Sequence, residues 1–286
     1  MATATIKLFL VQGDPAKLRT AEISNWNGKA LAAPRSEIEA LLERSEMSQV
    51  GVYLLIGTDS LSGNPALYIG EAESLRDRLK SHLKDKDFWT HVISIISNDE
   101  VLTKAHIRYL EGKLIDDANK AGRAKILNSQ SSGSKLPESD RADMDVFLEK
   151  IHQLLPVLGA NHLTQIVEYE PNDITNTSLL FCEIKGLKAS GQLTANGFVV
   201  FKGSQAVLEN RPSTVNNPWP AELREKLIRN EILKLTSDHL LFEKDAEFSS
   251  PSTAAAVIHG GTANGLTAWK NNKGKTLKEI ESQQVL

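Results

Sequence analysis

The chain has 286 residues, of which 41% are hydrophobic and 24% are charged, and this composition excludes a chain that is disordered throughout. Its length favours two domains, because a single domain usually has about 100 to 200 residues. The formal net charge of −3 argues against a general nucleic-acid coat protein, so any nucleic-acid site should be a local basic patch.

Cys182 is the single cysteine, which excludes an intrachain disulfide and a cysteine-rich zinc site. A lone thiol also fits the reducing cytoplasm. No apolar run approaches the roughly 18 residues of a membrane span, and the first residues lack the basic start and cleavage site of a signal peptide. We therefore expect a cytoplasmic protein.

The first part of the chain predicts a small α/β (α+β) core, with a three-stranded antiparallel sheet flanked by helices. Its loop at 58–65 contains the Ser, Gly, Asn and Pro residues that suit a hairpin. Periodicity predicts a first strand at 6–11, a helix over about 36–47, core strands at 50–57, 66–72 and 91–97, and helices at 74–86 and 101–119.

A Ser-, Gly- and charge-rich stretch at 128–143 predicts a loop or linker, and a connecting helix is expected over 144–159. The remaining pattern is that of a strand meander followed by helices, which predicts a second, mixed α+β domain. The expected organisation is an N-terminal extension at 1–48, a core at 49–130, a linker and connecting helix at 131–160, and a C-terminal domain at 161–286.

The helix expected at 74–86 carries a cluster of basic residues. At about 100° per residue its leucines form one apolar stripe, and Arg78 and His82 lie together along one edge of that stripe. Three further cations point to solvent and are candidates for nucleic-acid contacts: Arg76, Lys80 and Lys84.

Glu111 falls among apolar residues of the helix at 101–119, a costly position for an unpaired carboxylate. A divalent metal ion could compensate its charge, and so could a cation from another element. The third alternative is a half-exposed pair with Arg108, three residues earlier. Tyr53 and Tyr68 lie on neighbouring strands. The alternative to a chemical role for them is ordinary packing of their rings.

Together these residues resemble the motifs of the GIY-YIG nuclease family. Gly51 to Tyr53 stand for the first motif and Tyr68 to Gly70 for the second. Arg78 matches the catalytic arginine of the family, Glu111 its metal-binding glutamate and Asn128 its late asparagine. The resemblance covers about residues 50–130, under a third of the chain.

The resemblance implies hydrolysis of nucleic-acid phosphodiester bonds with one divalent ion, Mg²⁺ or Mn²⁺. Glu111 would bind the metal, Arg78 would neutralise charge on the phosphate, and Tyr53 or Tyr68 would help to deprotonate the attacking water. His82 is a candidate phosphate contact or proton carrier. A surface position is its alternative.

Glu71 departs from the repair-type members of this family, which resemble each other in having lysine at this position. A carboxylate there would repel phosphate unless it binds the metal or pairs with Arg76. This difference argues against a repair-type function.

Residues 247–277 resemble a small domain of unknown function that often follows GIY-YIG modules, and the implied role is DNA docking. Trp269 is expected in the core of this domain. Lys270 and Lys273 form a basic turn that could hold phosphates, with a solvated turn as the alternative.

The leading hypothesis is a metal-dependent DNA endonuclease with a Tyr-assisted, one-metal mechanism, in which DNA is the partner and RNA is not excluded. The alternative is a catalytically inactive scaffold that acts as a nucleic-acid-binding or regulatory protein. The neutral balance of residues 1–128, with 17 basic and 17 acidic side chains, motivates that alternative.

Overall fold

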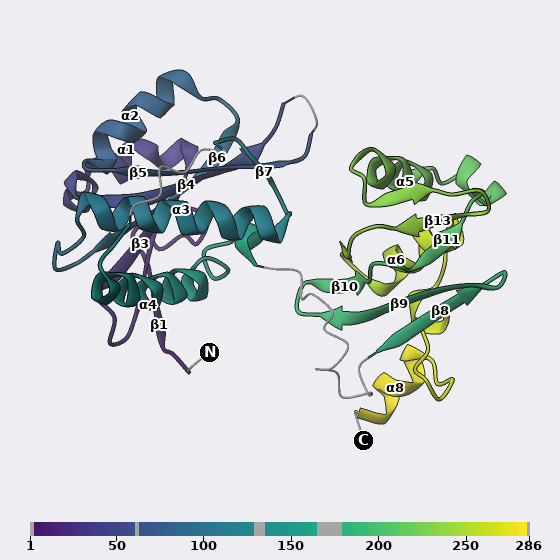
Figure 1. Cartoon of the computed structure of the whole chain (residues 1–286). Coiled ribbons are helices and arrows are strands. Elements are labelled where there is room, and N and C mark those ends of the chain that lie inside the picture. Colours follow the sequence, from purple (N-terminus) through teal and green to yellow (C-terminus); the bar gives the residue numbers. More distant parts are fainter. Residues whose placement is uncertain (1–2, 61–62, 129–134, 165–178, 285–286) are drawn as a thin grey trace. The chain divides into compact units, whose positions relative to one another are not determined.

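The computed structural model describes residues 3–60, 63–128, 135–164 and 179–284. The chain divides into two compact units, unit 1 (Met1–Gln165) and unit 2 (Ile166–Leu286) (Figure 1). Each unit contains both helices and strands, so the mixed α+β class is confirmed. None of the described helices combines the length and apolar character that crossing a membrane requires.

Unit 1 is built on a seven-stranded sheet in the order β1-β2-β3-β6-β4-β5-β7, whereas a three-stranded sheet was expected for its core. Neighbouring strands are antiparallel except β5 and β7, which are parallel. The strands are β1 (Ile6–Leu10), β2 (Arg19–Ile23), β3 (Gly28–Pro34), β4 (Gly51–Thr58), β5 (Pro65–Ala72), β6 (Trp89–Ser97) and β7 (Lys125–Ile126).

The N-terminal extension therefore belongs to the sheet, since β2 and β3 connect β1 to the edge of β6. The first strand was expected at 6–11 and is observed as β1, whereas β2 and β3 were not predicted, and β3 shows the physical reason. β3 has the sequence GKALAAP, and alanine and glycine have low strand propensity. Four consecutive residues of β3, Leu31 among them, are buried, so β3 shows no alternation of apolar and polar residues.

Helices cover both faces of this sheet. In Figure 1, α1 (Ile38–Glu43) and α2 (Leu75–Asp85) lie above it, and α3 (Lys104–Ala121) and α4 (Glu138–Leu154) lie below. Short 3₁₀ turns, η1 (Arg35–Glu37), η2 (Ser45–Ser48) and η3 (Asn161–Leu163), complete the unit. The linker expected at 128–143 lies partly outside the described residues, and α4 begins six residues earlier than expected, at Glu138.

Strand β4 contributes to two hydrophobic clusters because successive side chains point to opposite faces. Val52 and Leu54 pack in the cluster shared with α3 and α4. Tyr53 and Leu55 pack in the cluster shared with α1 and α2. Burial on both faces explains the continuous apolar run of this strand, and it places Tyr53 on the side of the sheet that α2 covers.

Unit 2 has a four-stranded sheet, β14-β10-β9-β8, and a three-stranded sheet, β11-β13-β12. Helix α6 and Trp269 belong to its core; Trp269 is fully buried, with its ring 4.3 Å from that of Phe198. The elements are β8 (Leu180–Ile184), β9 (Leu187–Thr194), β10 (Gly197–Val200), β11 (Gln205–Val207), η4 (Pro212–Val215), α5 (Trp219–Arg229), β12 (Leu233–Leu235), β13 (His239–Phe242), β14 (Ala246–Phe248), α6 (Pro251–His259), α7 (Gly265–Ala268) and α8 (Leu277–Gln284).

Candidate active site

The pairing of β4 with β5 brings the two motif tyrosines together. In this antiparallel register Tyr53 lies opposite Gly70, and Tyr68 lies opposite Leu55. The two tyrosines are thus diagonal neighbours on one face, with stacked rings 6.2 Å apart. A Cβ atom at position 70 would lie 2.3 Å from the Tyr53 hydroxyl oxygen. The space for the Tyr53 ring therefore requires glycine in the second motif.

Helix α2 places Arg78 and His82 over the same tyrosine. Leu75 and Leu79 are fully buried and seat the helix on the sheet, as the apolar stripe predicts. His82 Nε2 lies 2.7 Å from the Tyr53 hydroxyl oxygen, and Arg78 Nε donates to that oxygen at 3.2 Å. His82 is only 3% exposed, so its alternative as a surface histidine is excluded by the geometry.

Burial and the neighbouring charges set the protonation states of Tyr53 and His82. Burial, followed by the neighbouring Tyr68, raises the pKa of Tyr53 above its ordinary value, although Arg78 opposes the rise. Burial, with Arg78 and Lys86, lowers the pKa of His82 to about 4. At neutral pH Tyr53 is therefore protonated and His82 neutral; in the tautomer with its hydrogen on Nδ1, His82 accepts the hydroxyl hydrogen of Tyr53 at Nε2, while the hydroxyl oxygen accepts from Arg78.

Tyr68 forms the outer wall of this cluster. It is half-buried, whereas Tyr53 is fully buried. The Lys86 ammonium lies over its ring, 4.5 Å from the centroid, and the His82 ring meets it edge-on at 5.1 Å. Sequence reasoning missed Lys86, although its position at the end of the basic helix was a signal for it.

Glu111 lies half-buried on α3, and it forms no ion pair with any residue that the structure describes. Burial, and then the negative charge of Glu71, raises the pKa of Glu111 to about 7, while Arg78 and Arg108 oppose the rise. Arg108 Nε forms its ion pair with Glu71, at 3.7 Å. Of the alternatives above, neither the pair of Arg108 with Glu111 nor the pair of Glu71 with Arg76 is formed.

Arg78 connects the tyrosine cluster to this carboxyl group. Its guanidinium donates to Tyr53 and also acts electrostatically on Glu111. The hydrogen bond to Tyr53 in turn is the main cause that raises the pKa of Arg78. Tyr53, Arg78 and His82 thus contact one another directly, and Glu111 is linked to them through the charge of Arg78.

The donor set of this site fits a hard divalent cation that keeps most of its water ligands. Within the described ranges no group of three or more His, Cys, Asp or Glu residues could enclose a metal ion. Glu111 would therefore be a single protein ligand, with Glu71 nearby. The raised pKa of Glu111 means that its ionised form is destabilised in the metal-free protein. A bound Mg²⁺ or Mn²⁺ ion would stabilise the ionised form.

Asn128 lies beside the second motif, where its side-chain amide is bound to the backbone. Its Oδ1 atom accepts from the Ile69 amide at 3.1 Å, and its Nδ2 atom donates to the Ile69 carbonyl. The oxygen and the nitrogen of the Asn128 side chain both bind the backbone of Ile69, which lies between Tyr68 and Gly70. Asn128 therefore holds strand β5 in place.

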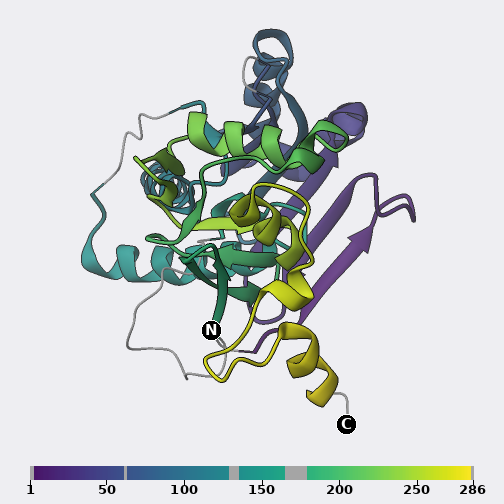
Figure 2. The same ribbon diagram turned by 90° about the vertical axis from the view of Figure 1, so that its right-hand side faces the viewer.

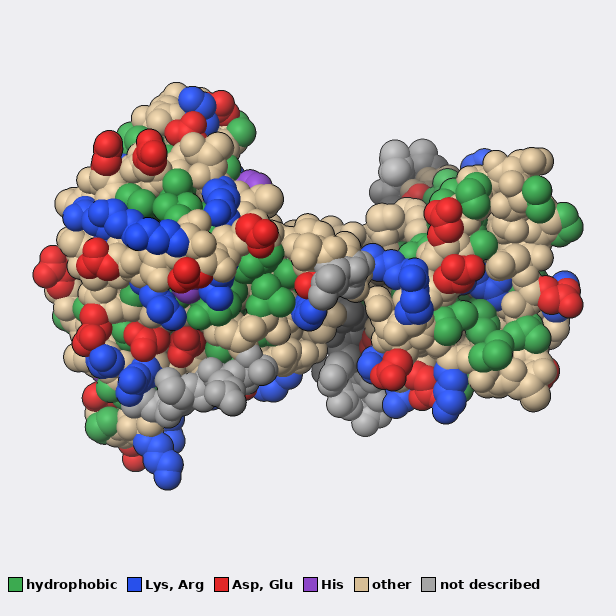
Figure 3. Space-filling view, turned by 90° about the horizontal axis from the view of Figure 1, so that it is seen from above, with side chains coloured by type: hydrophobic (Ala, Val, Ile, Leu, Met, Phe, Trp, Pro, Cys, Tyr) green, Lys and Arg blue, Asp and Glu red, His purple; other side chains and the backbone are tan. Residues whose placement is uncertain are grey.

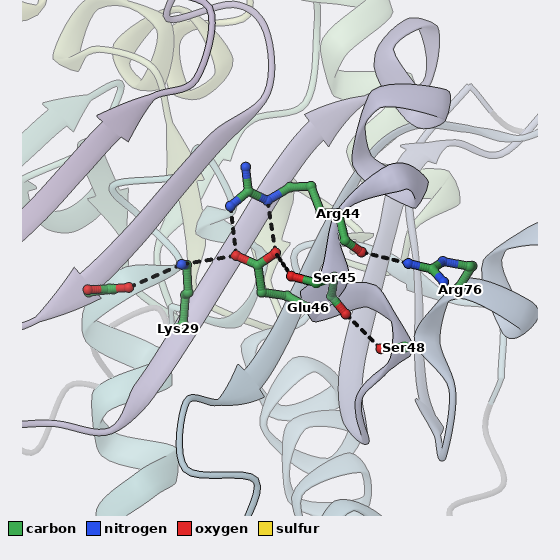
Figure 4. A network of polar contacts seen from close by, with 7 residues as sticks. Lys29, Arg44, Ser45, Glu46, Ser48 and Arg76 are labelled. Carbon is green, nitrogen blue, oxygen red and sulfur yellow. Dashed lines mark hydrogen bonds and ion pairs between the residues drawn. The ribbon is translucent and has the colours of Figure 1, made fainter.

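Arg76 does not point to solvent as its helical position predicted. Its Nε and Nη2 atoms donate to the carbonyls of Leu42 and Arg44, each at 2.8 Å, at the end of α1. The adjoining turn is held in turn by Glu46 (Figure 4), which pairs with Arg44 at 2.7 Å and Lys29 at 3.1 Å. The N-terminal segment thereby anchors the start of α2.

Burial opposes the ionisation of Glu46, but the bonds from Arg44 and Lys29 outweigh it and lower the pKa of this carboxyl group to about 2. Glu46 therefore stays charged across the physiological range.

The other basic candidates are exposed. Lys80 and Lys84 lie on the outer side of α2, and Lys270 and Lys273 lie on a turn of unit 2. That turn is ordered by the side chain of Asn271, which accepts from the Lys273 amide at 3.0 Å. On the face shown in Figure 3, Lys and Arg side chains of unit 1 are interspersed with Asp and Glu instead of forming one continuous basic surface.

One protein family matches the chain, and it matches unit 2. A family model described as a domain of unknown function (DUF4357) covers residues 180–281. No curated protein and no solved structure matches the chain. No family model matches residues 50–130, so the resemblance of unit 1 to GIY-YIG nucleases has only its motif residues in support. The C-terminal part of this chain is thus similar to a domain of unknown function, as the resemblance of residues 247–277 implied, and the match is longer than that stretch.

Proposed function

We propose that this protein is a metal-dependent endonuclease that hydrolyses DNA phosphodiester bonds, with a GIY-YIG-type catalytic core in unit 1 and a DNA-docking role for unit 2. The observation that carries the proposal is the convergence on Tyr53 of a neutral histidine and an arginine, together with a half-buried carboxyl group on which that arginine acts electrostatically. This set contains a proton acceptor, a cation for phosphate and a metal ligand.

Tyr53 is the tyrosine that activates water in this proposal. An unperturbed tyrosine hydroxyl, with a pKa of about 10, is a poor base at neutral pH. Here the hydroxyl can release its own hydrogen to His82 Nε2, 2.7 Å away, as it takes a proton from the attacking water. His82, with a pKa of about 4, is neutral beforehand and free to accept that proton.

Arg78 has two positions in this mechanism. In the free protein its guanidinium donates to the Tyr53 hydroxyl, which is fully buried. An exposed arginine on a helix surface can turn toward a bound phosphate, and this movement exposes the oxygen of Tyr53 to water. The guanidinium then stabilises the charge that develops on the phosphate oxygens. In this proposal Tyr68, half-buried beside Tyr53, orients the substrate.

A divalent ion bound by Glu111 would stabilise negative charge on the leaving oxygen. The protein's own contribution is to hold that carboxyl group half-buried on α3 at the same site as Arg78. The neighbouring Glu71 is partly neutralised by Arg108 at 3.7 Å, which limits its repulsion of phosphate.

A cleavage assay tests the proposal. The full chain is incubated with supercoiled plasmid, single-stranded DNA and RNA, in Mg²⁺ and in Mn²⁺. We expect nicking or linearisation of DNA that Glu111→Ala abolishes and that Glu149→Ala, at an exposed carboxylate on α4, preserves. If no metal supports cleavage, or if Glu111→Ala cuts as well as the parent chain, the proposal is wrong.

The second candidate function is nucleic-acid binding without catalysis. It is favoured by the two neighbouring carboxyl groups, Glu71 and Glu111, and by the mixed charges of the surface in Figure 3. It predicts DNA binding that weakens with salt and no cleavage in any metal. Metal-dependent cleavage that requires Glu111 would exclude it.

A further inference from the structure

Strand β1 is the outermost strand of the sheet in unit 1, and its outer side is open. Its one neighbour in the sheet is β2, and within the described parts of the chain no strand pairs with its other side. Figure 2 shows these purple N-terminal strands along one side of the unit 1 sheet. The opposite edge strand, β7, has only two residues, whereas β1 has five.

The backbone of β1 presents a regular row of hydrogen-bonding groups to the outside. Ser24 N donates to Thr5 O, and Val11 N donates to Leu18 O, which identifies the residues that face β2. Antiparallel strands alternate between residues bonded to the neighbour and residues bonded away from it. Ile6, Leu8 and Leu10 therefore direct their N–H and C=O groups away from β2.

The side chains of β1 are unusually apolar for an open edge. Leu8 is 43% exposed and Phe9 is 61% exposed. Proteins normally protect such edges with charges, proline, bulges or a covering element. In β1 the sequence IKLFL has one charge, Lys7, and no proline. An edge of this kind pairs readily with another strand.

We propose that β1 is a dimerisation strand, which pairs antiparallel with β1 of a second copy of this chain about a two-fold axis at Leu8. In this register Leu8 lies opposite Leu8 of the second copy, and Ile6 lies opposite Leu10. Each of these residues then donates one backbone hydrogen bond and accepts another, so the outward groups of both strands are satisfied. The two sheets become one continuous sheet.

The side chains of β1 complement themselves in this arrangement. Ile6, Leu8 and Leu10 form an apolar strip on one face. On the other face Lys7 lies opposite Phe9 of the second copy, as a pair whose side chains approach closely, and the ammonium meets an aromatic ring. No like charges face each other. The same strand thus supplies both halves of the interface, which favours a second copy over an unrelated partner.

The interface is short, so the dimer should depend on concentration. The molar mass of the full chain is measured by light scattering after gel filtration over a series of concentrations. The parent chain should approach twice the chain mass of 31.4 kDa. Leu8→Asp and Leu8→Lys should each remain at the single-chain mass, because equal charges then face each other across the axis.

A mixture of the two variants tests whether the residues at position 8 face each other. Asp and Lys at position 8 would lie opposite each other in a mixed pair, so an equimolar mixture should regain the dimer mass. Val146→Asp, on an exposed position of α4, is the matched control and should dimerise like the parent chain. Phe9→Ser, which removes the partner of Lys7, should weaken the dimer in the same assay.

Three results would overturn the proposal. The first is a parent chain that stays at 31.4 kDa at every concentration. The second is dimerisation of both charged variants, and the third is a mixture of the two variants that fails to regain the dimer mass. Because Leu8 is exposed, each variant should have the same melting temperature as the parent chain at a concentration where the parent is monomeric. A lower melting temperature would identify a misfolded variant. None of these outcomes depends on nuclease activity.

Discussion

Replacing Glu111 by glutamine should make unit 1 more stable in a pH-dependent manner. The carboxyl group has a pKa raised from 4.5 to about 7, caused first by burial and then by Glu71. One pKa unit is worth about 1.4 kcal/mol, so ionised Glu111 costs the metal-free fold up to about 3 kcal/mol. Residual solvent contact makes this figure an upper limit.

Proton binding determines how the stability changes with pH. Between pH 4.5 and about 7 the folded state binds the Glu111 proton more tightly than the unfolded state, so stability falls as pH rises through this window. Glu111→Gln lacks this cost at every pH. Its advantage over the parent chain should be absent near pH 4.5 and complete above pH 7.

Thermal unfolding at several pH values measures the effect. For a unit of this size, about 3 kcal/mol corresponds to roughly 6 to 12 °C in Tm, so Glu111→Gln should melt higher by up to that amount at pH 8. Mn²⁺ should raise the Tm of the parent chain and leave the variant unchanged. A Tm difference that is equal at low and high pH, or equal stabilisation of both proteins by Mn²⁺, would refute the reasoning.

Three further predictions concern the same site. Tyr53→Phe should lower the cleavage rate by about 100-fold or more, and far more than Tyr68→Phe does, because the Tyr53 hydroxyl contacts His82 at 2.7 Å; equal losses would contradict this assignment. Gly70→Ala should destabilise unit 1 by about 1 to 3 kcal/mol in denaturant unfolding, because its Cβ would lie 2.3 Å from the hydroxyl oxygen and 2.4 Å from the ring carbon Cζ of Tyr53; most of the cost should persist in the Tyr53→Phe background, which keeps that ring carbon, and its disappearance there would contradict the reasoning. Arg76→Gln should also cost about 1.5 to 3 kcal/mol, since it removes two bonds to the end of α1, and should leave the salt dependence of DNA binding as in the parent chain; a reduced salt dependence would instead make Arg76 a phosphate contact.

The helix that carries Arg78 and His82 was predictable because its signal is local. A leucine stripe at helical spacing predicted which side of α2 meets the sheet, and Leu75 and Leu79 are fully buried. The capping serine, Ser74, accepts from the Asp77 amide where the expected helix begins. Strands β4, β5 and β6 were likewise visible as apolar runs between turn residues.

The extent of the sheet was not predictable, because pairing between distant segments leaves little trace in either segment. The alanine-rich β3 is a strand because it pairs with β6, more than 50 residues later. Arg76 illustrates the same limit. Its helical position allowed a solvent-facing side chain, and only the folded position of α1 offers the two carbonyls to which it donates.

The sequence by itself determined the residue types and spacings from which a nuclease site was expected: two tyrosines on adjacent strands, Arg78 and His82 one helical turn apart, and Glu111 on the next helix. Only the tertiary structure decided how these groups act on one another. It places His82 against Tyr53, pairs Arg108 with Glu71 and, among the described residues, leaves Glu111 without an ion pair. The physical reason is that spacing controls local periodicity, whereas cross-strand register and desolvation arise from contacts between distant parts of the chain.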